Sequence, residues 1–130
     1  MDRDEFRQLL QQVADGWSRG DPRSAAEAFA EVAVYIEPPD RQRYVGREAL
    51  YAFFHGEGSE PRPMTMTWHA IAFDPASQTG FGEYTFTRPG RQKHGCAVVA
   101  VRSGLIASWR EYQYESDQAF EDFAGGSLVG

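Results

Sequence analysis

Two glutamates in this 130-residue chain stand where a carboxyl group could transfer protons. A strand over the segment "SWREYQY" would place Glu111 on the same face as Trp109 and Gln113. Glu37 closes the alternating segment "VAVYIE", directly before two prolines that cannot continue a strand ladder. Burial raises the pKa of a carboxyl group, which suits a general acid or base working near neutral pH. The two positions therefore indicate acid–base chemistry.

Each acidic position also has a structural interpretation. Glu111 could form an ion pair with an arginine or a hydrogen bond with a hydroxyl group, because such networks also shift pKa values. Glu37 could equally point into solvent, and Glu83 could pair with Arg110 or Arg102. Alternation alone leaves open which face of "SWREYQY" is buried.

The remaining residues of chemical interest form no recognisable constellation. His55, His69 and His94 lack the spacing of metal ligands, so we expect no metal site. Cys96 is the only cysteine, which excludes an intrachain disulfide, and its apolar strand segment "CAVVAV" predicts a buried, inert thiol. The segment "GFGEYTF" does not open a helix and is no dinucleotide loop. We therefore expect no cofactor.

The composition bounds the class of protein. Of the residues, 42% are hydrophobic and 14% aromatic, and the length fits a single domain over 1–130. Lys93 is the only lysine, and a net charge of −6 with dispersed arginines does not give the basic patch that nucleic acid or an anionic membrane requires. No apolar run could span a bilayer, and "MDRDEF" does not resemble a signal peptide, so we expect a cytoplasmic protein.

Hydrophobic periodicity and turn residues divide the chain into helices followed by strands. Phe6, Leu10 and Trp17 fall on one stripe of a first helix. Asp21 and Pro22 are a typical start for a second helix. We expect helices over about 1–19, 22–31 and 46–56, a four-strand antiparallel meander over 64–115 and a flexible tail over 124–130. Helices segregated from strands in this way are typical of the α+β class.

Three short motifs carry a resemblance to a known family. The Gly-Asp pair between the first two helices, the "GRE" that opens the third, and the "I-x-x-W-R-E-Y" of the last strand together resemble the SnoaL-like branch of the nuclear transport factor two-like superfamily. The likeness spans nearly the whole chain. It implies a cone-shaped (cystatin-like) curved antiparallel sheet packed against three helices, a pocket between them, and a homodimer through the outer face of the sheet. The superfamily includes isomerases, cyclases, hydrolases, dehydratases and transport factors.

The resemblance extends to the ketosteroid isomerases at one catalytic position. Their proton-transferring carboxylate ends the first strand, nine residues before the glycine of the third-helix motif, and Glu37 stands nine residues before Gly46 here. Their two oxyanion donors correspond to Val13 and Val98, which carry no acidic proton. The familiar steroid isomerisation is therefore not implied.

A second comparison concerns the limonene-epoxide-hydrolase-like enzymes, which end in a similar "G-x-I-x-x-W-R-D-Y". Glu111 matches the acid of that motif, which takes part in activating water, and Tyr35 matches a water-positioning tyrosine. Glu37 replaces their asparagine. Their Arg-x-Asp on a middle strand falls near Glu83 and Thr85, so the base and its arginine are both missing.

If the strands present the same faces as in these relatives, the candidate residues line one cavity. Glu37 and Glu111 are the candidate catalytic pair, acting as general acid and base on a small, mostly apolar molecule. The candidate substrate-binding residues are Trp17, Tyr35, Phe53, Phe54, Trp68, Glu83, Thr85, Trp109 and Gln113. Arg110, Tyr112 and Tyr114 would then face outward, where they suit a dimer interface. The alternative is a ligand-binding or protein-interaction module without turnover, in which the aromatic residues only fill the core.

Overall fold

The computed structural model describes residues 1–37, 42–56, 58 and 64–125. The elements in chain order are α1 (Arg3–Ser18), α2 (Pro22–Glu27), β1 (Phe29–Glu37), β2 (Gln42–Val45), α3 (Arg47–His55), β3 (Thr65–Asp74), β4 (Thr79–Arg88), β5 (Arg91–Arg102), β6 (Leu105–Glu115) and α4 (Phe120–Ala124). Most of the expected tail, from residue 126 onward, lies outside the described residues.

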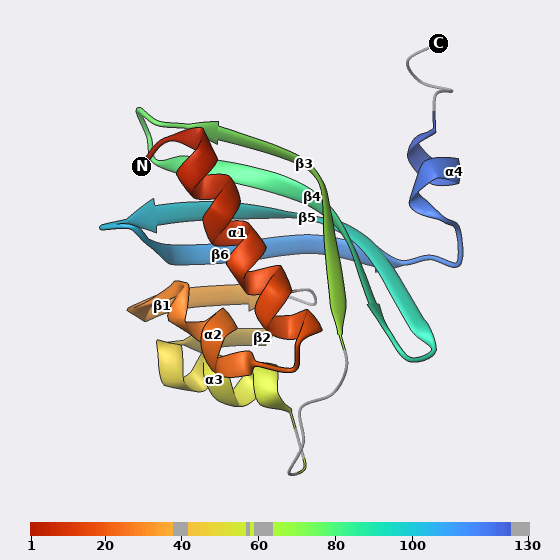
Figure 1. Ribbon diagram of the computed structural model, residues 1–130, viewed down its shortest axis with the longest axis horizontal. Helices are drawn as coiled ribbons and strands as arrows, with labels where there is room; N and C mark the ends of the chain where they lie inside the picture. Colours follow the sequence, from red (N-terminus) through yellow and green to blue (C-terminus); the bar gives the residue numbers. More distant parts are fainter. Residues whose placement is uncertain (38–41, 57, 59–63, 126–130) are drawn as a thin grey trace.

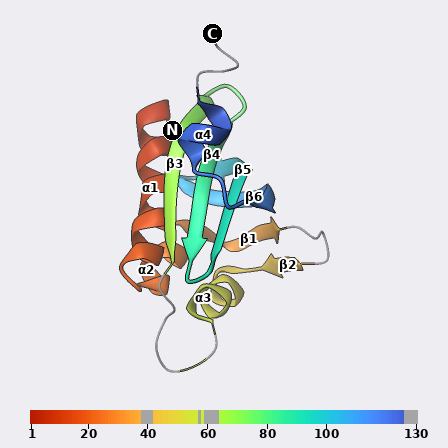
Figure 2. The ribbon, with the colours of Figure 1, turned by 90° about the vertical axis from the view of Figure 1, so that its right-hand side faces the viewer.

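One curved sheet carries all six described strands, in the order β2-β1-β6-β5-β4-β3. Neighbouring strands are antiparallel except β1 and β6, which run parallel. Figures 1 and 2 show α1 lying across one face of this sheet, with α2 and α3 near its β1–β2 edge. The expected α+β class, with helices covering a curved sheet, is confirmed, and the short helix α4 follows the last strand.

Helix α1 begins with a reciprocal cap and buries one stripe. The Glu5 amide donates to the Asp2 carboxylate at 2.8 Å, and the Asp2 amide donates back to the Glu5 side chain at 2.9 Å. Its buried face includes Phe6, Leu10 and Trp17, the stripe expected from periodicity. No described helix combines the length and apolar character that crossing a membrane requires.

The second helix is shorter than the expected 22–31. It ends at Glu27, and β1 begins at the fully buried Phe29. The reason is sheet pairing, because Phe29 lies opposite Ile106 of β6 and the Ile106 amide donates to the Ala28 carbonyl at 2.9 Å. Tertiary contacts thus override the helix propensity of this alanine-rich stretch.

Strand β2 is an element that the periodicity did not predict. It is only four residues long and forms an antiparallel pair with β1, with Val45 opposite Val34 and Gln42 opposite Glu37. Strand β1 is therefore held on both sides, by β2 and by β6. This double pairing fixes the direction in which the Glu37 side chain leaves the sheet.

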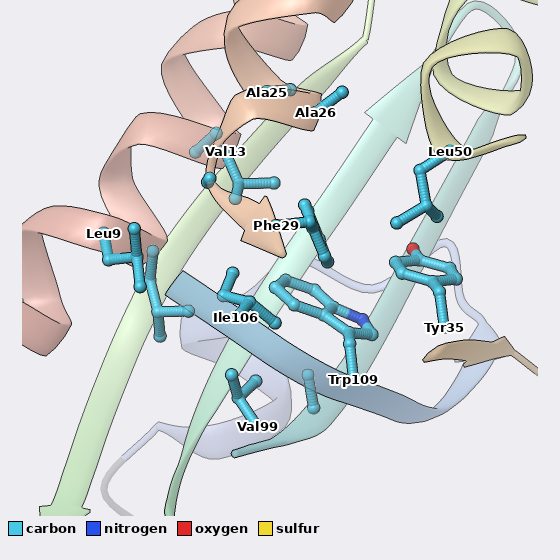
Figure 3. Close-up of a cluster of buried hydrophobic side chains, with 14 of the residues drawn as sticks. Leu9, Val13, Ala25, Ala26, Phe29, Tyr35, Leu50, Val99, Ile106 and Trp109 are labelled. Carbon is cyan, nitrogen blue, oxygen red and sulfur yellow. The ribbon is translucent and has the colours of Figure 1, made fainter. Parts of the chain in front are cut away.

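Aromatic side chains fill the space between the sheet and the helices. Trp109 of β6 is fully buried, and its ring lies 5.6 Å from that of Tyr35, in a stacked arrangement, and 5.8 Å from that of Phe29. Figure 3 shows the Trp109 indole with Phe29, Ile106 and Tyr35 around it. Because protein interiors are packed as densely as organic crystals, these rings give β1 and β6 a rigid common surface.

Candidate functional site

A cavity of about 540 Å³ opens beside this aromatic core. Its lining comes from all six described strands, from α1 and α3, and from Met64 directly before β3. The lining residues are Trp17, Tyr35, Glu37, Gln42, Tyr44, Phe53, Phe54, Met64, Met66, Tyr84, Phe86, Arg88, Arg91, Lys93, Glu111 and Gln113. Seven of these sixteen residues are aromatic and five carry a charged side chain. A concave site that combines aromatic side chains with polar groups is typical of small-molecule binding.

Glu111 is the most enclosed acid of this cavity, with 6% of its surface exposed. The Tyr35 hydroxyl and the Trp109 indole N–H both donate to its Oε1 atom, each at 2.7 Å. Burial and the neighbouring Glu111 charge raise the pKa of Tyr35 well above its usual value, so this hydroxyl stays protonated. Because an indole can only donate, Oε1 is an acceptor, and a proton on Glu111 belongs on Oε2.

Glu37 lies beside Glu111 on the neighbouring strand. The parallel register pairs Tyr35 with Trp109 and Ile36 with Arg110. Glu37 and Glu111 are the next inward residues of the two strands, and both line the cavity. Burial, and next the charge of Glu111, raise the pKa of Glu37 to about 7.

The same effects act on the deeper acid. Burial raises the pKa of Glu111, and the hydrogen bonds from Tyr35 and Trp109 oppose that rise. Two adjacent carboxyl groups with raised pKa values titrate as a coupled pair. Near neutral pH such a pair can hold one proton, which provides an acid and a base at the same wall.

Tyr84 and Gln113 form a second polar element of the wall. The Tyr84 hydroxyl donates to Gln113 Oε1 at 2.7 Å, and burial raises the pKa of Tyr84. A Cβ atom at Gly95 would lie 2.8 Å from that hydroxyl oxygen and 2.7 Å from Gln113 Cβ, so this contact requires glycine. Since Gln113 Oε1 is occupied as an acceptor, its amide NH₂ is the group that can donate to a ligand.

Trp17 presents a donor without an acceptor. Its indole N–H is buried and has no hydrogen-bond partner among the described residues. The ring packs edge-on against Phe54 at 5.1 Å and against Phe86 at 5.9 Å. A buried donor left unpaired costs about 1–3 kcal/mol. A ligand oxygen within reach of Trp17 would recover that cost.

Most of the residues expected at the site meet at this cavity. Those that line it are Trp17, Tyr35, Glu37, Phe53, Phe54, Glu111 and Gln113. Trp109 lies behind them and holds Glu111 through its N–H. Trp68 supports the wall from further away, since its indole donates to the Leu10 carbonyl of α1 at 3.0 Å.

The expectation that Glu83 and Thr85 share this cavity is corrected by the structure. The Thr85 hydroxyl is hydrogen-bonded to His69 and to His94, at 2.7 and 2.9 Å, and Glu83 borders a groove with His94 on the outer face of the sheet. Alternation along β4 explains the placement. A Cβ atom at Gly82 would lie 2.6 Å from the Trp68 ring, so Gly82 faces inward and its neighbour Glu83 faces outward.

Sequence reasoning missed one group of lining residues that carries charge. Arg88, Arg91 and Lys93 come from the two arms of the β4–β5 hairpin, where Arg88 pairs with Arg91 in register. The available signal was the alternation from the inward-facing Tyr84, because every second residue after it continues the same face to Arg88.

The family of the chain follows from a match over most of its length. The model of the SnoaL-like domain family matches residues 10–109. No curated protein matches the chain.

Solved structures extend the comparison at the level of fold. An NTF-2 like protein of unknown function from Burkholderia xenovorans LB400 is 18% identical, with a TM-score of 0.73 and 92% of each chain covered. A protein of unknown function with a cystatin-like fold from Methylobium petroleophilum PM1 is 20% identical, with a TM-score of 0.71 and coverage of 92% of this chain and 81% of that one.

A third similar structure is a hypothetical protein with a ketosteroid isomerase-like fold from Catenulispora acidiphila DSM 44928. It is 14% identical, with a TM-score of 0.65, and the alignment covers 80% of this chain and 83% of that one. These likenesses concern the fold, and the family match covers most of the sequence. The chain belongs to the SnoaL-like domain family.

Proposed function

We propose that this SnoaL-like protein binds a small, mostly apolar organic molecule in its cavity and moves a proton within it by cofactor-independent acid–base catalysis. The observation that carries the proposal is that two carboxyl groups, Glu37 and Glu111, line one cavity from adjacent parallel strands. The aromatic lining suits an apolar body. The reaction class that fits is proton transfer next to a carbonyl group, as in an isomerisation or a cyclisation.

The proposed step balances without a further reactant. The ionised member of the pair takes a proton from the carbon beside the substrate carbonyl, and the electron pair of that C–H bond forms an enolate. The protonated member then returns a proton to the substrate at another carbon or at oxygen. The pair ends with one proton, as it began. Tyr35 fixes Oε1 of Glu111, and the Gln113 amide orients the substrate.

The test is proton exchange in a model ketone. 2-Tetralone is an apolar ketone with acidic C–H bonds, and NMR in D₂O follows the loss of those protons. We expect the protein to accelerate this exchange and Glu111→Gln to lower the rate by at least about 100-fold, the usual contribution of a general acid or base. Glu83→Gln, which removes a carboxyl group on the other face of the same sheet, is the matched control and should leave the rate unchanged.

Two outcomes contradict the proposal. Binding of 2-tetralone without accelerated exchange would favour a ligand-binding module without turnover. If circular dichroism shows that Glu111→Gln does not fold, then Glu37→Gln, at the half-buried end of β1, takes its place. Full exchange activity in a folded Glu37→Gln variant would then exclude the carboxyl pair.

The outer face of the sheet supports a proposed homodimer. Phe81, Tyr112 and Tyr114 point away from the cavity and are 50%, 61% and 49% exposed. Large aromatic side chains beside an arginine are enriched at protein interfaces, and Arg110 lies on the same face of β6. A second copy of the chain on this face would cover them.

A further inference from the structure

Three cations face the cavity of a chain whose net charge is −6. They are Arg88, Arg91 and Lys93, the last being the only lysine in the sequence. All three come from the β4–β5 hairpin, and Figure 1 shows this hairpin curling past the same end of the sheet at which β1 and β6 finish. The cations therefore occupy one end of the cavity rather than its whole wall.

Among the described residues, two of these cations form no ion pair. Arg91 forms an ion pair with Glu115. Within the described part of the chain, no carboxylate lies in ion-pair distance of Arg88 or Lys93. The cavity lining contains two carboxyl groups, Glu37 and Glu111, and both have raised pKa values, so together they carry less than two negative charges near neutral pH. Glu115, which lies opposite Lys93 in the β5–β6 ladder, adds one negative charge, so the three cations still outnumber the ionised carboxylates at this end of the cavity.

Arg88 and Lys93 could have a purely structural role, which is to offset the negative charge of Glu37 and Glu111. Lys93 and Arg88 do lower the pKa of Glu37, but burial outweighs them. A counter-charge role would be served best by direct ion pairs, and none forms here among the described residues. Cations that line a cavity and form no ion pair with a described residue are instead placed to meet a charge that the ligand brings.

We propose that the ligand of this cavity is an organic carboxylate, with its apolar body against Trp17, Phe53 and Phe54 and its carboxylate against Arg88 and Lys93. The guanidinium group matches a carboxylate in a bidentate manner, and the ammonium group adds a point charge. This inference rests on the proposed function for the cavity itself and adds the class of ligand. Anchoring the carboxylate at the hairpin end also orients the body of the ligand toward the glutamate pair.

A matched pair of ligands tests the inference. 2-Naphthoate and 2-naphthamide share one apolar body and differ in charge, and isothermal titration calorimetry at neutral pH gives both affinities. We expect 2-naphthoate to bind at least about 10-fold more tightly, as one charge-assisted contact allows. The double variant Arg88→Gln, Lys93→Gln should lose this preference and keep its affinity for 2-naphthamide. Arg102→Gln, at the far end of β5, removes one positive charge that does not line the cavity, and as the control it should keep the preference.

The results separate the two proposals. Equal affinities for the two ligands, or a preference that survives in the double variant, would overturn the carboxylate inference, whatever the result with 2-tetralone. Accelerated exchange of 2-tetralone without that preference would leave the proposed function standing alone. A clear preference without any exchange would support the carboxylate site and overturn the catalytic proposal. Absence of binding by both ligands would overturn the inference.

Discussion

Replacing Glu37 with Gln should stabilise the protein at about pH 8 and have little effect at pH 4.5. Burial and the Glu111 charge raise the pKa of Glu37 from 4.5 to about 7. A group whose pKa is higher in the folded chain stabilises the fold below its unfolded pKa, and this contribution is lost as the pH rises through the folded pKa. The difference of about 2.5 in pKa corresponds to about 3.4 kcal/mol. Because Glu37 is partly exposed to water, screening reduces this figure to about 1–2 kcal/mol.

Urea unfolding at the two pH values measures the effect. The free energy of unfolding of Glu37→Gln, relative to the wild type, should be higher by about 1–2 kcal/mol at about pH 8 and nearly equal at pH 4.5. Glu83→Gln on the outer face is the control for adding an amide to the sheet. A stabilisation of the same size at both pH values would refute the reasoning, because it would not arise from the titration of Glu37.

Two further predictions concern the site and the outer face. Tyr35→Phe removes one of the two hydrogen bonds to Glu111 Oε1, each worth about 1.5–3 kcal/mol to a charged group. The pKa of Glu111 should therefore rise further, and the pH profile of 2-tetralone exchange should move upward with it. An unchanged profile would show that the tyrosine does not tune this acid. Tyr112→Asp should convert the proposed dimer to a monomer in analytical ultracentrifugation, and an intact dimer would exclude this face of the sheet.

The regular elements of the fold could be predicted because each presents one apolar face. Helix α1 repeats its buried residues at helical spacing, and the strands after residue 64 alternate between turn residues. The end of α2 could not be predicted in this way. The segment from Pro22 to Glu31 contains good helix formers, but Phe29 gains complete burial and pairing with β6. That gain depends on a strand near the other end of the chain, which no local pattern reports.

The candidate site was predictable only where the face of a strand could be assigned. Glu37 and Glu111 were expected on one wall, from alternation together with the family resemblance, and their strands pair in that register. The prediction for Glu83 came from an alignment with the Arg-x-Asp of the epoxide-hydrolase-like enzymes. In the structure Gly82 faces inward, where an indole ring from β3 fills the space, and Glu83 faces outward. The outward Phe81 is half exposed, so hydrophobicity alone would have assigned the opposite face.

The separation between the cations and the glutamates has a chemical consequence. Direct ion pairs from Arg88 and Lys93 would lower the pKa values of Glu37 and Glu111 and keep both groups ionised, which would remove the proton that the pair shares. At a distance, the cations lower the pKa of Glu37 only in part, and it stays at about 7. The same distance leaves both cations able to bind an anionic group of the ligand. Neutralising Arg88 and Lys93 should therefore weaken the binding of a carboxylate more than it changes the pKa values of Glu37 and Glu111.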